Sequence, residues 1–167
     1  MVDLLHASLD ADQRFEALAT RLNARFDGEI RIGGNYASVV ADGRTLHVSG
    51  QVPRVGTEVV VQGRVGGDVN LDAGQHAARI CAMRVLAVLR QHLGSLSKVA
   101  RIAKINVFVQ CTEHFTQHSE VADAASGVFH EVLGERGVHA RTSVGVYQLP
   151  KNAAVELDAV AIAVESV

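Results

Sequence analysis

The chain has 167 residues, of which 48% are hydrophobic and 20% are charged, and its formal net charge is −2. This composition predicts one folded domain with a substantial core, not a disordered or coiled-coil chain. The 16 basic residues are scattered singly and only 4% of residues are aromatic. Both facts argue against nucleic acid as a partner. The chain has neither a cluster of basic residues to bind phosphates nor enough aromatic residues for bases to stack on.

The first thirty residues mix charged with apolar side chains and contain no apolar core of a signal peptide. No run is long enough to span a bilayer. Cys81 and Cys111 lack a CxxC spacing and are expected to be reduced thiols, with no base beside Cys111. We therefore expect a cytoplasmic protein that makes no membrane contact.

Apolar periodicity predicts a first helix over about residues 11–26, with Asp10 as its N-cap. Asp42-Gly43 predicts a hairpin between strands at 36–40 and 45–49, and another strand is expected at 58–61. The loop 63–70 contains glycines but neither a GxGxxG order nor a following Lys-Ser/Thr. Its spacing therefore argues against a nucleotide site.

A second helix is predicted from after Asn70 to about residue 93, with Gly94 as its stop. A strand at 103–109 and a third helix at 119–133 follow. The last two strands carry Arg141 and Glu156, and the Leu149–Asn152 turn between them predicts that they fold back on each other as an antiparallel hairpin. This order predicts an α+β fold with a mixed sheet and helices on one face. The other, apolar face would then need cover, for which self-association is the ordinary solution.

Glu156 is the most unusual residue of the last strand. Side-chain alternation places it on the same face as Val160 and Ile162. A carboxylate on an apolar face needs either a partner or a raised pKa. From the residues alone, a structural Arg141–Glu156 pair and a ligand site both remain open.

Other candidate sites are weaker. His114 and His118, four residues apart, would bind zinc only if both lay on one helix face, and exposed histidines are the simpler account. His139 and Ser143 lack an orienting acid for a Ser–His nucleophile. We expect neither a metal nor an organic cofactor.

Several separated blocks together resemble the reactive-intermediate deaminase (RidA/YjgF) family, also labelled endoribonuclease L-PSP. The blocks are Tyr36, Ser49-Gly50-Gln51-Val52-Pro53, the strand around Asn106, His139-Ala140-Arg141, and Leu149-Pro150-Lys151 through Glu156. The resemblance covers a RidA-like domain at residues 35–167, and residues 1–34 form an N-terminal helical extension. It implies a chorismate-mutase-like subunit with two long helices on one face of a mixed sheet, assembled as a homotrimer with clefts between subunits.

The resemblance also implies roles for individual residues. Arg141 matches the arginine that holds a substrate carboxylate, Glu156 the acid that activates water, Tyr36 a tyrosine of the cleft, and Gly50 a glycine whose backbone faces the ligand. Ser143 and Asp123 stand at substrate-binding positions where cysteine and asparagine are common, and His139 replaces a common proline. These three departures mark a divergent branch.

Two functions are therefore expected. The first is hydrolytic deamination of reactive 2-imino or enamino acids to 2-oxo acids and ammonia. The alternative is a non-catalytic protein that binds a small carboxylate metabolite in the same cleft. In both cases the partner is a small carboxylate-bearing imine or 2-oxo acid.

Overall fold

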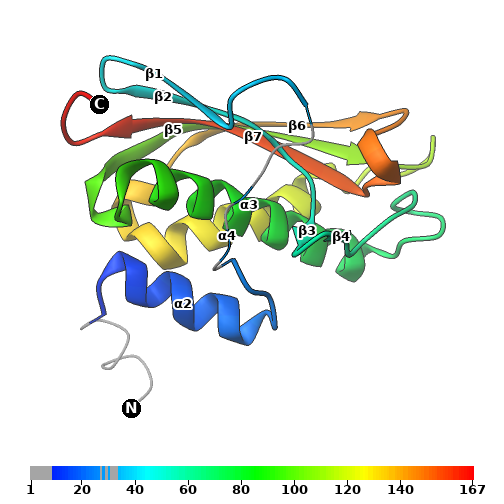
Figure 1. Ribbon diagram of the computed structural model, residues 1–167. Helices are drawn as coiled ribbons and strands as arrows, with labels where there is room; N and C mark the ends of the chain where they lie inside the picture. The colour runs from blue at the N-terminus through cyan, green and yellow to red at the C-terminus, as the bar shows by residue number, and fades with distance from the viewer. Residues whose placement is uncertain (1–8, 27, 29, 31–33) are drawn as a thin grey trace.

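The computed structural model describes residues 9–26, 28, 30 and 34–167, which form a sheet covered by helices on one face (Figure 1). The sheet has the strand order β1-β2-β7-β5-β6. Its strands are β1 (Val39–Asp42), β2 (Thr45–Gln51), β5 (Val99–Gln110), β6 (Ala140–Val146) and β7 (Val155–Ala163). A separate two-stranded hairpin contains β3 (Arg54–Val55) and β4 (Glu58–Val59). The predicted α+β class with a mixed sheet is confirmed.

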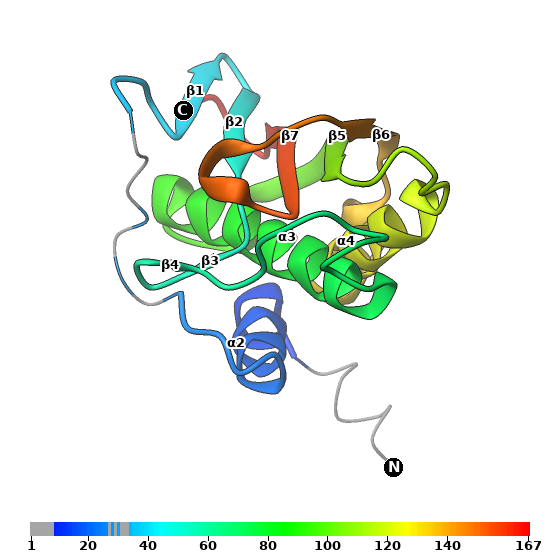
Figure 2. The same ribbon diagram turned by 90° about the vertical axis from the view of Figure 1, so that its right-hand side faces the viewer.

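Two long helices, α3 (Leu71–Leu93) and α4 (His118–Leu133), cover one sheet face, and α2 (Ala11–Arg21) lies beyond them (Figures 1 and 2). Short 3-10 turns occur at η1 (Leu96–Lys98), η2 (Gly134–Gly137) and η3 (Pro150–Asn152). Among the described residues, no helix is both long enough and apolar enough to cross a bilayer.

Helix boundaries follow local capping chemistry. Asn70 accepts a hydrogen bond from the Ala73 backbone N–H at the start of α3, and Gly94 ends that helix with a positive φ of 84°. Asp10 and Gln13 form a reciprocal capping box on α2. The first helix is shorter than predicted and ends at Arg21, because Asn23 turns the chain with a φ of 50°.

The predicted hairpin between the last two strands is wrong. Strand β5 lies between them, with β6 parallel to it and β7 antiparallel to it. The buried side chain of Gln110, at the end of β5, explains the route of the connection. It accepts a hydrogen bond from the Leu149 backbone N–H (2.7 Å) and donates to Oδ1 of Asn152 (2.6 Å). The turn is therefore held over the end of β5, and β7 enters on its far side.

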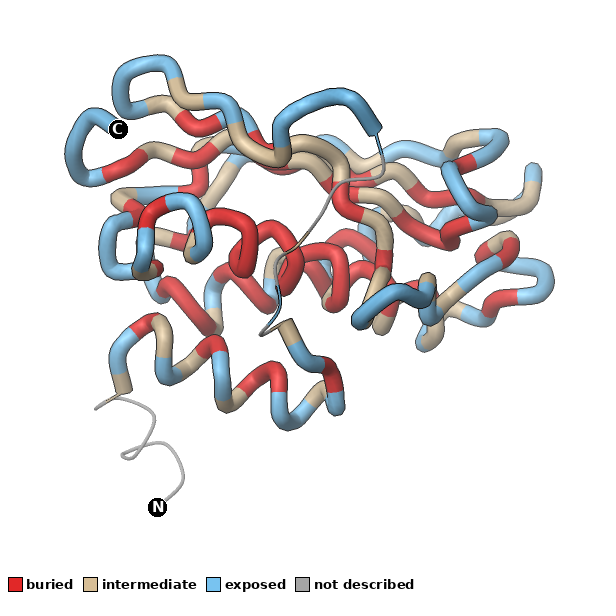
Figure 3. Tube along the Cα trace, viewed as in Figure 1, coloured by how far each residue is buried: buried red, intermediate tan, exposed pale blue. Residues whose placement is uncertain are grey.

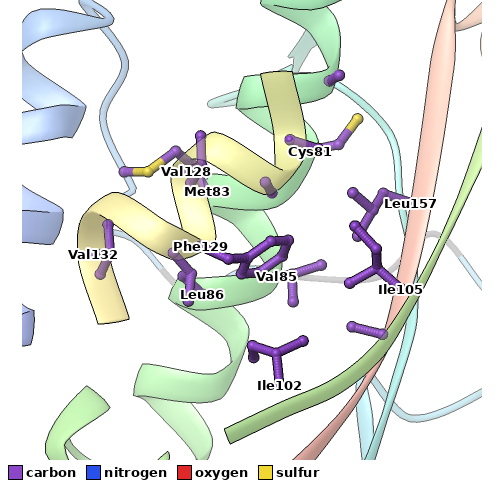
Figure 4. Close-up of a cluster of buried hydrophobic side chains, with 14 of the residues drawn as sticks. Cys81, Met83, Val85, Leu86, Ile102, Ile105, Val128, Phe129, Val132 and Leu157 are labelled. Atoms are coloured by element: carbon purple, nitrogen blue, oxygen red, sulfur yellow. The ribbon is translucent and has the colours of Figure 1, made fainter. Parts of the chain in front are cut away.

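Alternation along β7 divides the sheet into two faces. Its odd-numbered residues are buried in the core against the helices, and its even-numbered residues are half-buried on the other face. Figure 3 shows buried segments along the sheet strands and along the helices that cover the sheet. The core between sheet and helices includes Ile102 and Ile105 of β5, Leu86 of α3 and Phe129 of α4 (Figure 4).

Phe15 anchors α2 to this core and supplies a stability prediction. Its side chain is 1% exposed, and its ring lies 6.0 Å from that of Phe26. Phe15→Ala should lower the free energy of unfolding by about 3–5 kcal/mol, because it removes buried apolar area and leaves a cavity. Thr20→Ala on the exposed side of α2 is the control and should change it by less than about 0.5 kcal/mol. Equal effects in urea denaturation would show that α2 is not held by this contact.

Candidate active site

Arg141 lies on the helix-covered face of the edge strand β6. Its register partner on β5 is the buried Ile105, so its side chain extends toward α4. Its Nη1 donates to Oδ1 of Asp123 (2.7 Å) and to Oγ of Ser126 (3.0 Å), both on α4. These two bonds hold one corner of the guanidinium. Among the described residues, no hydrogen bond engages Nη2 or Nε, which remain free for a bidentate acceptor.

Ser126 connects Arg141 to His139. The His139 ring places Nδ1 2.6 Å from the Gly137 carbonyl oxygen, which can only accept, so Nδ1 carries the proton. In the neutral ring Nε2 is then an acceptor, and the Ser126 hydroxyl, 3.0 Å away, donates to it. The hydrogen bonds therefore run in one direction, from Arg141 through Ser126 and His139 to Gly137.

Burial lowers the pKa of His139, and the nearby His130 and Arg141 act in the same direction, while the Gly137 carbonyl opposes them. The neutral ring that this hydrogen-bond direction requires is thus also the favoured form at neutral pH. Sequence reasoning missed this contact. Ser126 and His139 are thirteen positions apart, and only the packing of β6 on α4 brings them together.

Glu156 lies on the other face of the sheet. Its carboxylate reaches Gly50, which lies where the register of β2 on β7 shifts between Val48 and Gln51. A Cβ at position 50 would overlap Oε1 of Glu156, so the absence of a side chain there makes this approach possible. Burial raises the pKa of Glu156, and the negative charge of Asp158 adds to the effect. A carboxyl group of this kind is suited to taking up and releasing a proton.

Tyr36 lies in the segment that leads into β1, and its side chain is 57% exposed. Ser49 ties this segment to β2 beside Gly50, since its hydroxyl donates to the Ala37 carbonyl (2.7 Å) and its backbone N–H to the Ser38 carbonyl. The ring itself lies against Gly34. Tyr36 therefore belongs to the Gly50 side of the molecule.

The structure sorts the predicted site residues into two groups. Ser143 is paired with the buried Val107 and shares the face and strand of Arg141, with Asp123 opposite on α4. Glu156 and Gly50 lie together on the open face. Within one chain, β5 and the thickness of the sheet separate the two groups. The expected contact of Arg141 and Glu156 across a hairpin is absent because these strands are not neighbours.

A cysteine–histidine pair lies farther along β6. The Sγ of Cys111 is 3.4 Å from Nε2 of His118, and a Cβ at Gly145 would clash with both. The expectation that no base lies beside Cys111 is therefore wrong. Burial raises the pKa of the Cys111 thiol, against the opposing effect of Arg64, so the thiol form is favoured. No cluster of three potential metal ligands occurs in the described part of the chain.

Comparison with known proteins gives the family. Residues 27–161 match the family described as "YjgF/chorismate mutase-like, putative endoribonuclease". The chain belongs to this family. The predicted RidA/YjgF membership and chorismate-mutase-like fold are thus confirmed.

Individual relatives cover most of the chain. Protein TCP17 of Trypanosoma cruzi is 42% identical over 153 residues, which are 91% of this chain and 96% of that protein. A 2-iminobutanoate/2-iminopropanoate deaminase of Dermatophagoides farinae is 28% identical, over 77% of this chain and 86% of that one. The crystal structure of Atu1372 from Agrobacterium tumefaciens, a protein of unknown function, has a TM-score of 0.79 at 37% identity, covering 90% and 94% of the two chains.

The raised pKa of Glu156 predicts how stability depends on pH. A carboxyl group whose folded pKa exceeds its unfolded value stabilises the fold when protonated, and this stabilisation is lost as the pH rises through the folded pKa. Glu156→Gln should therefore have a higher Tm than the parent protein at pH 7, and the difference should shrink toward pH 4. The control is the exposed Glu58→Gln. A lower Tm for Glu156→Gln at pH 7 would contradict this prediction and show that a cation of another subunit stabilises the carboxylate by more than burial and Asp158 destabilise it.

Proposed function

We propose that the protein hydrolyses reactive 2-imino and enamino acids to 2-oxo acids and ammonia, in clefts between the subunits of a homotrimer. The observation that carries the proposal is the separation of two chemically suited groups, Arg141 and Glu156, onto opposite faces of one sheet. Family membership and the deaminase relative from Dermatophagoides farinae support the reaction class.

A site that uses both residues requires two chains. Strands β6 and β7 are separated by β5, a spacing of roughly 10 Å between strand axes. The two side chains also extend from opposite faces, and α4 covers the face of Arg141. A neighbouring subunit that presents its open face to the β6–α4 edge would bring its Glu156 to this Arg141.

The open face has a composition that suits such contact. Phe108, Val160 and Ile162 are only partly buried there, and Val40 is 55% exposed. His47, Lys104 and Asp158 lie among these apolar residues on the same face, so the exposed apolar area is interrupted by polar groups. Burying the apolar part would still favour association. Association of three copies through this face would cover it and place each Glu156 at a subunit boundary.

In the proposed reaction, Nη2 and Nε of Arg141 bind the substrate carboxylate, and Tyr36 with the backbone at Gly50 orients the nitrogen. The ionised Glu156 takes a proton from water as the water oxygen bonds to the imine carbon. This gives a carbinolamine. Glu156 returns the proton to nitrogen and then accepts the carbinolamine hydroxyl proton as the C=O bond forms and the C–N bond breaks. The 2-oxo acid and ammonia leave, and the ammonia takes this proton from Glu156 as ammonium. The protonated imine is already electrophilic, so this route needs neither metal nor organic cofactor.

A second candidate is a non-catalytic protein that binds a small carboxylate. It is favoured by the anchoring of Arg141, which Asp123 and Ser126 complete without any contribution from Glu156. Binding needs only the arginine, whereas turnover also needs the water-activating carboxylate. The two candidates therefore differ in what Glu156 does.

Glu156→Gln separates the two functions. With iminopyruvate supplied in a coupled assay, turnover should fall by roughly 10²–10⁴-fold, as is usual when a general base is removed. Affinity for 2-oxobutanoate should change little, as measured by calorimetry. Turnover retained in the variant would remove Glu156 from the mechanism. Binding without turnover in the parent protein would favour the non-catalytic candidate.

Arg141→Lys tests the carboxylate anchor. Lysine keeps the charge but loses the planar fork, and a charged hydrogen bond is worth about 1.5–3 kcal/mol, so affinity for 2-oxobutanoate should fall about tenfold or more. Asp123→Asn is the matched variant. It keeps an acceptor for Nη1 but removes a negative charge beside the ligand, so affinity should rise. Unchanged binding in Arg141→Lys would place the acid elsewhere.

A further inference from the structure

A cavity of about 650 Å³ lies between the segment after α2, helix α3 and the β3–β4 hairpin. Figure 2 shows the hairpin and α2 on the same side of α3. Three arginines line the cavity, Arg25, Arg54 and Arg84, and none of the described lining residues carries a carboxylate. The cavity is far from Arg141, because β3 continues from β2 while β6 forms the opposite edge of the sheet.

Arg84 is the first sign of a built site. It is only 7% exposed, in a part of α3 whose other side chains are apolar. Its Nε donates to Oε1 of Gln51 and its Nη1 to the Arg54 carbonyl oxygen, both at 3.2 Å. These acceptors are neutral. A guanidinium so deeply buried is strongly stabilised only by an anion, and none of the described residues supplies one.

Arg54 is the second and independent sign. Its Nε is buried and has no hydrogen-bond partner among the described residues. Burial lowers the pKa of Arg84, and the positive charge of Arg54 lowers it further, so the two guanidiniums repel each other. Two positive charges that lie close together without a counter-charge destabilise the folded protein by electrostatic repulsion. An anion bound between them would remove this repulsion.

We propose that this cavity binds the phosphate group of a small phosphorylated molecule. A monocarboxylate carries one charge and two oxygens, which one guanidinium fork already satisfies. A phosphate monoester carries a charge of nearly −2 and three terminal oxygens, which match several guanidiniums. Asn23 and Thr57 on the wall can donate to the remainder of the ligand. The volume leaves room for more than the phosphate itself.

The position of the cavity suggests why this chain has it. Asn23, Arg25 and Phe26 precede residue 27, where the match to the family begins. The segment after α2 therefore adds one wall, and one of the three arginines, to a surface made by β3 and α3. The site lies on the helix side of β2, where Arg84 contacts Gln51, whereas the neighbouring Gly50 faces Glu156 of the proposed deaminase cleft on the other side of the sheet.

Thermal unfolding of the full chain in inorganic phosphate tests the proposal. Phosphate should raise the Tm saturably above sodium chloride of equal ionic strength, and succinate should not. Arg54→Gln, at the cavity wall, should weaken the phosphate effect at least tenfold in concentration. Arg79→Gln, on the same helix but outside the cavity, should retain it. If the Arg84→Gln variant folds, it should show no stabilisation by phosphate. If it does not fold, the result for Arg54→Gln decides the test.

Several outcomes would overturn the proposal. They are the absence of stabilisation beyond chloride, an equal effect of succinate, and an unchanged effect in Arg54→Gln. The chain also has Asp27 and Glu29, which lie outside the described residues. If the parent protein ignores phosphate and the Asp27→Asn, Glu29→Gln variant binds it, the chain's own carboxylates occupy the cavity and the proposal is wrong.

Discussion

The two-residue alternation of β7, held between β2 and β5, is the constraint on which the rest of the structure depends. Every odd position from Val155 to Ala163 faces the helices and is buried. Because alternation is strict, the even positions must all appear on the other face. Glu156 is therefore displayed on the open face by the same pairing that builds the core. A one-residue slip against β5 would bury its carboxylate under α3.

The parallel pairing of β6 with β5 determines which side chains surround Arg141. A parallel neighbour requires a crossover, and α4 provides it. The crossover helix returns over the strand that follows it, so Asp123 and Ser126 lie within reach of the guanidinium. Helix α4, which connects β5 to β6, therefore also supplies the residues that hold Arg141 in place. In the proposed function, Arg141 and Glu156 are two halves of a site that one subunit cannot join by itself.

The local features and the fold class can be predicted from the sequence, but the order of the last strands cannot. The bounds of α3 follow from Asn70 and Gly94, which act within one helical turn. Strand order depends on contacts such as that of Gln110 with Asn152, forty-two residues apart in the chain, which no local pattern encodes. The turn chemistry of residues 149–152 was interpreted correctly as a turn, but a turn does not determine which strand the chain pairs with next. The sequence does not single out Arg84, because it is one of several charged residues in α3 and only the packing shows that it is buried.

The same geometry limits what Cys111 can contribute. The cysteine is near Gly145, four residues along β6 from Arg141, or about 13 Å at the rise of an extended strand. An imine whose carboxylate is bound by Arg141 has its reactive carbon one bond from that carboxylate, far short of this distance. The raised pKa of the thiol further reduces its nucleophilic form at neutral pH. His118 beside it could accept a proton, yet no substrate atom would lie near enough to react. In the proposed mechanism the Arg141 edge therefore uses water activated by a carboxylate rather than the Cys111 thiol. The Asp123 carboxylate is already bonded to Arg141, so the proposal takes the water-activating carboxylate, Glu156, from the open face of another copy.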